Sequence, residues 1–121
     1  MKEIHYISGA AGFIGSNLVS TLLSNGHVVV GIDNFTLGKK ENLESHKRNS
    51  NFNLIEADVA KSFWHCDAEI FLKLSYTKRV FWHFAANSDI SQGSKNVKID
   101  LHNTFLSSIS VSEFLLKNPF D

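Results

Sequence analysis

The chain has 121 residues, and 43% of them are hydrophobic, which is enough for one compact domain over residues 1–121. Its formal net charge is zero, which argues against nucleic-acid binding, because that function needs a basic face. No apolar run approaches the roughly 20 residues that span a membrane, and the N-terminus does not resemble a signal peptide. The single cysteine, Cys66, has no metal-ligand pattern around it. We therefore expect a cytoplasmic protein without a membrane segment or a metal centre.

Segments of strand and helix character alternate along the chain. Four apolar segments of strand length are predicted strands: residues 2–8, 28–32, 52–57 and 80–85. Three segments with apolar residues at helical spacing are predicted helices: residues 13–25, 63–74 and 100–117. The last helix has four apolar residues roughly on one face: Leu101, Phe105, Ile109 and Leu116. The polar connection 34–50 has room for one short helix around residues 40–46, and Pro119 should end the last helix.

This alternation predicts an α/β fold, namely a Rossmann-like, doubly wound parallel sheet that is truncated after its fourth strand. The order of the strands would be 3-2-1-4, which leaves the fourth strand at an edge. That strand has an apolar, uncharged run that includes Trp82. An apolar edge with unpaired backbone groups tends to pair with another chain, so we expect Trp82 or its neighbours to be exposed. We also expect the chain to self-associate through this edge, or to be marginally stable and prone to aggregation when alone.

The most informative segment joins the first strand to the first helix and contains Gly9, Gly12 and Gly15. In this position the three glycines allow a tight turn, close approach of the backbone to a pyrophosphate, and packing of the helix against the strands. The helix N-terminus offers free N–H groups to the same anion. The segment is not a triphosphate-binding P-loop, because Ile14 and Gly15 stand where that loop needs Gly and Lys. The alternative is a glycine-rich turn without a ligand.

Two carboxylates stand at predicted strand ends, where ligands bind in open α/β sheets. Asp33 ends the second strand, and there it could accept hydrogen bonds from the ribose hydroxyls of adenosine and repel a 2′-phosphate. It therefore favours NAD over NADP. Asp58 follows the third strand. For both residues the alternative is a side chain that only caps the following turn.

Together these motifs resemble the extended short-chain dehydrogenase/reductases, specifically the NAD-dependent epimerase/dehydratase family, of which UDP-glucose 4-epimerase is a member. Residues 9–16 are similar to the opening motif of that family almost letter for letter. Residues 33–43, 57–59, 83–87 and 103–104 continue the resemblance in the same order, over essentially the whole chain. It implies NAD as the cofactor and the following cofactor-binding residues: Gly9, Ala11, Gly12, Phe13, Ile14, Gly15, Asp33, Asn34, Gly38, Asp58, Val59, Ala85, Ala86 and Asn103.

The resemblance also implies roles for single residues. Asp58 would face the adenine edge, residues 83–87 would line the nicotinamide side, and Asn103 would begin the long helix beneath the active site. Ser88 departs from the pattern, since several family members have Lys there. From the residues alone, His83 is more simply a packed core histidine, and Asn103 could be an ordinary helix residue.

The catalytic Tyr-x-x-x-Lys of the family does not occur in these residues. The chain has only Tyr6, within the first strand, and Tyr76, which is followed by Val80 where Lys would be needed. The resemblance therefore implies the NAD-binding portion of a nucleotide-sugar epimerase or dehydratase, whose substrate is a UDP- or dTDP-linked sugar and whose reaction begins with hydride transfer to NAD. Two alternatives stay open: a non-catalytic NAD-binding or interaction module, and an inactive truncated product.

Overall fold

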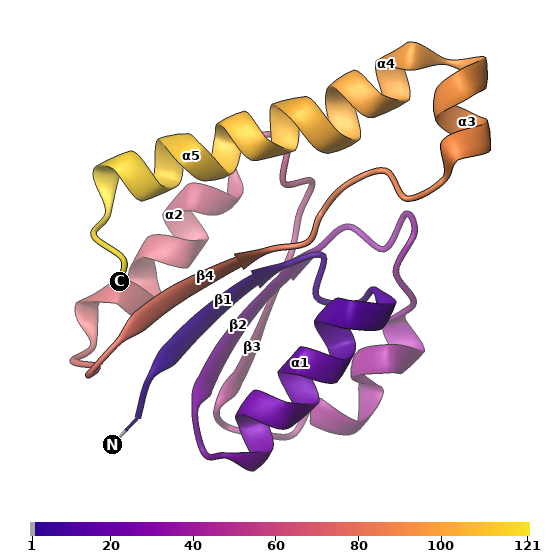
Figure 1. Ribbon diagram of the computed structural model, residues 1–121. Helices are drawn as coiled ribbons and strands as arrows, with labels where there is room; N and C mark the ends of the chain where they lie inside the picture. The colour runs from indigo at the N-terminus through magenta and orange to yellow at the C-terminus, as the bar shows by residue number, and fades with distance from the viewer. Residues whose placement is uncertain (1) are drawn as a thin grey trace.

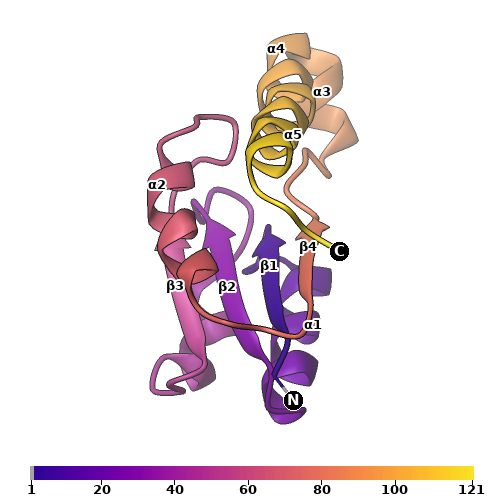
Figure 2. The same cartoon turned by 90° about the vertical axis from the view of Figure 1, so that its left-hand side faces the viewer.

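The computed structural model describes residues 2–121. Four parallel strands form one sheet in the order β3-β2-β1-β4, with bounds β1 Ile4–Ser8, β2 Val28–Asp33, β3 Phe52–Glu56 and β4 Arg79–His83. Figure 2 shows the strands side by side, with β4 at one edge. This arrangement confirms the predicted fold class and strand order. Within residues 2–121, no helix combines the length and the apolar character needed to cross a membrane.

Helices cover both faces of the sheet (Figure 1). One face carries α1, Phe13–Ser24, and the 3₁₀ helix η1, Lys40–His46. The other face carries α2, Trp64–Glu69, its 3₁₀ continuation η2, Ile70–Lys73, and the long α5, Ser107–Lys117. All residues of β2 are buried, because the strand is covered on both faces and paired on both sides. Its uninterrupted apolar run is the expected sequence for that environment.

The segment before α5 differs from the prediction, because it contains a short helix that we did not expect, α3, Ile90–Lys95. The carboxylate of Asp89 caps this helix by accepting a hydrogen bond from the Gln92 N–H over 3.2 Å. An Asp followed three residues later by Gln is a recognisable N-terminal signal, so the helix could have been found from sequence. The long helical run then begins at α4, Val97–Asp100, and continues through a π-helix, η3, Leu101–Leu106, into α5.

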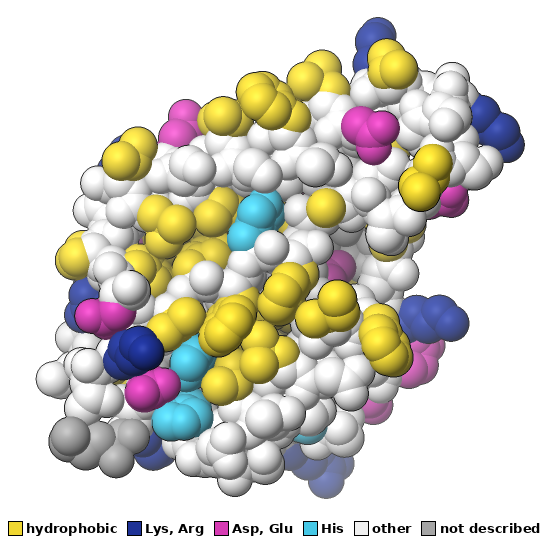
Figure 3. All heavy atoms as spheres, viewed as in Figure 1, with side chains coloured by type: hydrophobic (Ala, Val, Ile, Leu, Met, Phe, Trp, Pro, Cys, Tyr) yellow, Lys and Arg dark blue, Asp and Glu magenta, His cyan; other side chains and the backbone are white. Residues whose placement is uncertain are grey.

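The predicted apolar face of the last helix is wrong as a packing face. Its four apolar residues are all exposed, and Leu116 is exposed by 87%. The face that packs on the sheet contains Ser107, Ser110, Val111 and Phe114. Small serines allow the helix to approach closely, and Ser110 also bonds to Trp64 and His65. Figure 3 shows hydrophobic side chains along the outer ridge of this helical run.

The edge strand β4 is only partly protected. Trp82 and Phe84 are each exposed by 36%, as the apolar edge predicted. At the start of the strand, the Asp121 N–H donates to the Arg79 carbonyl over 2.8 Å, and the Arg79 N–H donates to the Asp121 carboxylate over 2.7 Å. The helix ends before Pro119, as predicted, and the following tail therefore covers the first residue of the edge.

Candidate functional site

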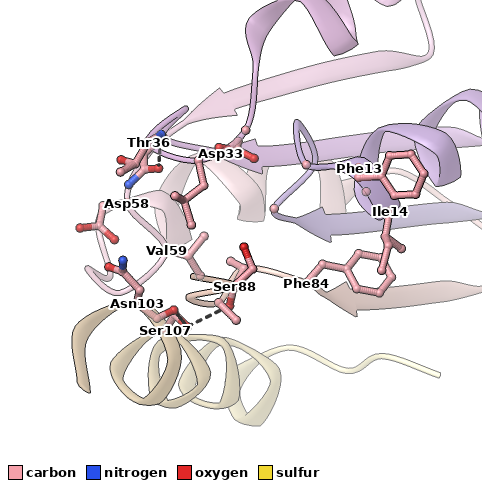
Figure 4. A pocket seen from close by; sticks show the side chains of 18 of the residues that line it. Phe13, Ile14, Asp33, Thr36, Asp58, Val59, Phe84, Ser88, Asn103 and Ser107 are labelled. Atoms are coloured by element: carbon pink, nitrogen blue, oxygen red, sulfur yellow. Dashed lines mark hydrogen bonds between the residues drawn. The ribbon is translucent and has the colours of Figure 1, made fainter. Parts of the chain in front are cut away.

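A cavity of about 430 Å³ lies at the carboxyl ends of the strands (Figure 4). Every candidate cofactor-binding residue except Ala11 lines it. Ala11 is fully buried behind the loop, where its backbone N–H and carbonyl bond to other segments, and it does not line the cavity. Its assignment as a cofactor-binding residue stays a prediction. The sequence analysis missed six lining residues as candidates: Thr36, Leu37, Ala57, Phe84, Ser88 and Ser107. Most of them are sequence neighbours of predicted residues, and Ser107 lies one helical turn after Asn103.

The three glycines of the loop differ in how strictly the surrounding backbone requires the absence of a side chain. Gly9 has φ +73°, and a Cβ there would lie 2.9 Å from the backbone of Phe84 and Ala85. A Cβ on Gly15 would lie less than 3.0 Å from the Gly9 carbonyl oxygen, so this glycine lets α1 pack against the loop. Gly12 differs, because its φ of −73° suits any residue and its Cβ would meet only the Gly9 oxygen, at 3.3 Å. The packing of the protein itself demands Gly9 and Gly15 more than Gly12.

The N-terminus of α1 presents free backbone donors to the cavity. Ser16 is the first residue whose N–H bonds within the helix, to the Gly12 carbonyl. The N–H groups of Phe13, Ile14 and Gly15 have no acceptor among residues 2–121. The first turn has no acidic residue, and Gly12 has no side chain to cap it. This end of the helix therefore offers several donors and the positive end of the helix dipole to an anion.

Asp33 both caps the turn after β2 and lines the cavity. Its side chain is buried, with Oδ2 accepting from the Ala11 N–H over 2.9 Å and Oδ1 from the Phe35 N–H over 2.7 Å. Phe35 has a positive φ of 60°, so the Asp33 cap stabilises an unusual backbone conformation. A carboxylate has about four lone-pair sites, and two remain for a ligand. The turn-capping interpretation and the ligand interpretation are thus compatible.

Asp58 also lines the cavity, and it follows β3, the strand next to β2. Its Oδ1 accepts from the Ala60 N–H over 3.0 Å, which caps the local turn. Its Oδ2 lies 2.7 Å from Nε2 of His102, on the π-helix η3. The sequence analysis did not find His102, because no local pattern connects residues so far apart in the chain.

His83 is a satisfied structural histidine at the end of β4. Ser8 Oγ accepts from the N–H groups of Phe84 and Ala85, so its own proton is donated to His83 Nδ1, 2.6 Å away. The other ring nitrogen then donates to Ser108 Oγ over 3.1 Å. Burial lowers the pKa of His83 below its usual 6.5. These bonds agree with the core interpretation and fix the backbone where Ala85 lines the cavity.

Neither tyrosine lines the cavity. The Tyr6 hydroxyl is buried and donates to the Ala68 carbonyl over 2.9 Å, and burial raises its pKa strongly. Burial also raises the pKa of Tyr76. A proton-transfer tyrosine needs the opposite shift, toward neutral pH, and access to a ligand. Neither residue meets those requirements.

A second cluster of side chains lies at the other end of the sheet. Ligand atoms of Glu3, His5 and His27 lie within 4.8 Å of one another. However, Trp82 Nε1–H donates to His5 Nδ1, and the Glu3 N–H donates to His27 Nδ1. The proton of each neutral ring therefore lies on Nε2, where a metal ion would need a lone pair. The arrangement fits a hydrogen-bonded cluster better than a metal centre.

A parallel sheet in the order 3-2-1-4, a glycine turn at the N-terminus of α1 and a buried Asp at the end of β2 define a Rossmann-like fold of the dinucleotide-binding class. The profile of the NAD dependent epimerase/dehydratase family matches residues 5–121. The chain belongs to this family, whose cofactor is NAD, as the motifs indicated.

Individual relatives agree with this assignment. The UDP-glucose 4-epimerase of Mycolicibacterium smegmatis is 32% identical over 108 residues, which are 88% of this chain and 33% of that protein. The solved UDP-glucose 4-epimerase of Thermotoga maritima with UDP-glucose is 28% identical, with a TM-score of 0.77 over 99% of this chain and 35% of that one. The Bordetella bronchiseptica enzyme WbmG in complex with NAD and UDP is 29% identical, with a TM-score of 0.75 over 93% and 33% of the two chains. The chain thus spans about a third of the length of these relatives.

Proposed function

We propose that the chain binds NAD in the cavity at the strand ends and forms the NAD-binding portion of an enzyme that acts on nucleotide sugars. The proposal rests on one observation: unpaired backbone N–H donors and a buried carboxylate lie in the same cavity. The α1 N-terminus presents unpaired N–H groups on one side of the cavity, and Asp33 presents a carboxylate with free lone pairs on another. An anionic pyrophosphate joined to a ribose with two hydroxyls satisfies both sets of groups.

Different residues of the cavity would bind different parts of NAD. The turn from Gly9 to Gly15 would hold the pyrophosphate, Asp33 with Asn34 and Gly38 the adenosine ribose, and Asp58 with Val59 the adenine. The small residues Ala85 and Ala86 would leave room for the flat nicotinamide. Asn103, on η3, lies in the cavity wall beside Asp58 and Ser107 (Figure 4). A side chain on Gly12 would stand in the wall of the cavity, and its Cβ would make one tight contact, 3.3 Å from the Gly9 carbonyl oxygen.

The parent reaction is proposed from the relatives. NAD, when bound, would accept a hydride from a carbon of the sugar. The substrate would be a UDP- or dTDP-linked sugar, and relatives solved with UDP-glucose or UDP favour the UDP form. These 121 residues contain no tyrosine placed for the accompanying proton transfer. A non-catalytic NAD-binding module and an inactive product are therefore the competing functions.

Calorimetric titration of the 121-residue chain with NAD and NADP tests this proposal. We expect saturable binding of NAD and weaker binding of NADP, because the Asp33 carboxylate opposes a 2′-phosphate. Titration with UDP-glucose is the matched control for a general affinity for nucleotides. Absence of NAD binding by a chain that melts cooperatively would overturn the proposal.

We also propose that the chain self-associates through the edge of β4. Backbone groups alternate in direction along a strand, so those of Phe81 and His83 point outward like those of Arg79. Only Arg79 is paired there, by Asp121, and the outward groups of the other two have no partner among residues 2–121. Trp82 and Phe84 add exposed apolar surface beside this edge, and Figure 3 shows hydrophobic side chains gathered in this region. A second copy that pairs along this edge would satisfy both features.

A further inference from the structure

The carboxylate of Asp58 is held by donors from two different elements. The Ala60 N–H, in the loop after β3, binds Oδ1 over 3.0 Å. His102 Nε2, on η3, binds Oδ2 over 2.7 Å. The first bond is local and fixes only one oxygen. The second comes from a distant part of the chain, so that both oxygens, and therefore the plane of the carboxylate, have a defined direction. Asp58 lies beside Asn103 at one end of the cavity (Figure 4).

His102 lies in the π-helical turn η3. Isolated π turns are rare and occur mostly at functional sites. In η3, His102 and its neighbour Asn103 are both half-buried on the side of the cavity, whereas Leu101 and Phe105 are exposed. Asn103 lines the cavity itself, and His102 bonds to a residue that lines it.

We propose that His102 is a positioning residue that aims the Asp58 carboxylate at the exocyclic amine of adenine and so makes the site selective for adenine over hypoxanthine. This inference rests on the proposed function, in which Asp58 meets the base. A fixed carboxylate accepts a hydrogen bond from the adenine N6 amine but repels the O6 carbonyl of hypoxanthine. A carboxylate that rotates freely can turn toward the N1–H of hypoxanthine instead. Fixing the carboxylate therefore creates selectivity, and releasing it reduces selectivity.

Titration with NAD and with nicotinamide hypoxanthine dinucleotide tests the role of His102. We expect the unmodified chain to bind NAD about tenfold more tightly than the hypoxanthine analogue, because a site built for a donor rejects a ligand that lacks it. His102→Ala should weaken NAD binding by about three- to tenfold, since the carboxylate must then be ordered on binding. The affinity for the analogue should change much less, so the preference for NAD should shrink.

Two further variants separate positioning from a general structural effect. His102→Gln keeps an N–H donor for Asp58 and should restore most of the preference. Leu101→Ala alters the adjacent exposed side chain, which does not line the cavity, and should leave both affinities unchanged. An equal loss of affinity for both dinucleotides in His102→Ala, or no change in either, would overturn the positioning role while NAD binding itself stood. If the unmodified chain bound neither dinucleotide, the proposed function would fail, and this inference with it.

Discussion

The backbone N–H of Ala11 donates a hydrogen bond to Oδ2 of Asp33, and the two atoms are 2.9 Å apart. This bond ties the glycine turn after β1 to the end of β2. Asp33 therefore has two tasks in the proposed site: its carboxylate shapes the turn that would hold the pyrophosphate, and it presents free lone pairs to the ribose.

Replacing Asp33 with Ala should lower the affinity for NAD more than the affinity for NADP, because the charge that opposes a 2′-phosphate is lost. We expect the gap between the two affinities to narrow by about 1–3 kcal/mol in calorimetric titrations. Loss of the bonds to Ala11 and Phe35 should also reduce the stability of the chain. Glu56→Gln is the matched control, since Glu56 pairs with Asp33 in the sheet but does not line the cavity. An unchanged gap in Asp33→Ala would show that Asp33 only caps the turn.

Substitution of Gly12 and of Gly15 should separate binding from stability. Gly12→Val should abolish NAD binding, because its side chain would stand in the part of the cavity wall proposed to hold the pyrophosphate. It should cost less stability than a change at Gly15, since its Cβ has a single tight contact, at 3.3 Å. Gly15→Ala should instead destabilise the fold by about 1–3 kcal/mol, since its Cβ would overlap the Gly9 carbonyl. Urea unfolding and NAD titration of both variants measure the two effects. NAD affinity that survives in Gly12→Val would contradict the assignment of the loop.

The chain alone should show no turnover with UDP- or dTDP-sugars in the presence of NAD. Tyr6 is buried and bonded to Ala68, and Tyr76 lies outside the cavity, so neither can exchange a proton with a sugar hydroxyl. Product formation is measured by chromatography of the nucleotide sugars. Turnover by the purified chain would mean that other groups carry out the proton transfer.

Tyr6→Phe should lower the stability of the chain by about 1–2 kcal/mol, because the hydrogen bond of the hydroxyl is lost.

Stability should fall as the pH drops below about 6.5. Burial is the main cause that lowers the pKa of both His5 and His83 in the folded chain. Between the folded pKa and the usual 6.5, the unfolded chain binds more protons, and acid therefore favours unfolding. Each histidine can contribute at most about 1.4 kcal/mol per pH unit.

Urea unfolding at about pH 7.5 and about pH 5.5 measures this loss of stability. His5→Gln removes one of the two titrating groups, and the change between the two pH values should become smaller. A pH dependence equal to that of the unmodified chain would show that His5 does not bind a proton on unfolding.

Light scattering over a concentration series should detect self-association of the chain. Trp82→Lys places a charge beside the free edge of β4 and should shift the population toward monomer. Phe63→Lys is the matched control, because Phe63 is also an exposed aromatic residue, with 82% of its surface accessible, but it precedes α2 and is not part of β4. A strictly monomeric chain that melts cooperatively would refute association through β4, and it would indicate that the pairing of Asp121 with Arg79 protects the edge sufficiently.

The sequence by itself determined the α/β class and the position of the glycine turn. These features depend on local patterns: uninterrupted apolar runs in buried strands, helical spacing in α1, and glycines within a few residues of one another. The strand order was expected only as a consequence of the doubly wound class. An acidic residue at the end of a strand is equally local, which is why Asp33 and Asp58 were identified before their surroundings were known. The cap of α3 at Asp89 is a local signal of the same kind, although α3 was not predicted.

Only the tertiary structure decided which groups meet across the cavity and which helix face is buried. The bond between His102 and Asp58 joins segments that no spacing rule connects. The last helix has apolar residues around much of its surface, so periodicity alone favoured the face with Leu116, whereas close packing on the sheet selected the face with the small Ser107 and Ser110. Burial depends on what the neighbouring elements leave room for, and that is a property of the assembled fold rather than of any one segment.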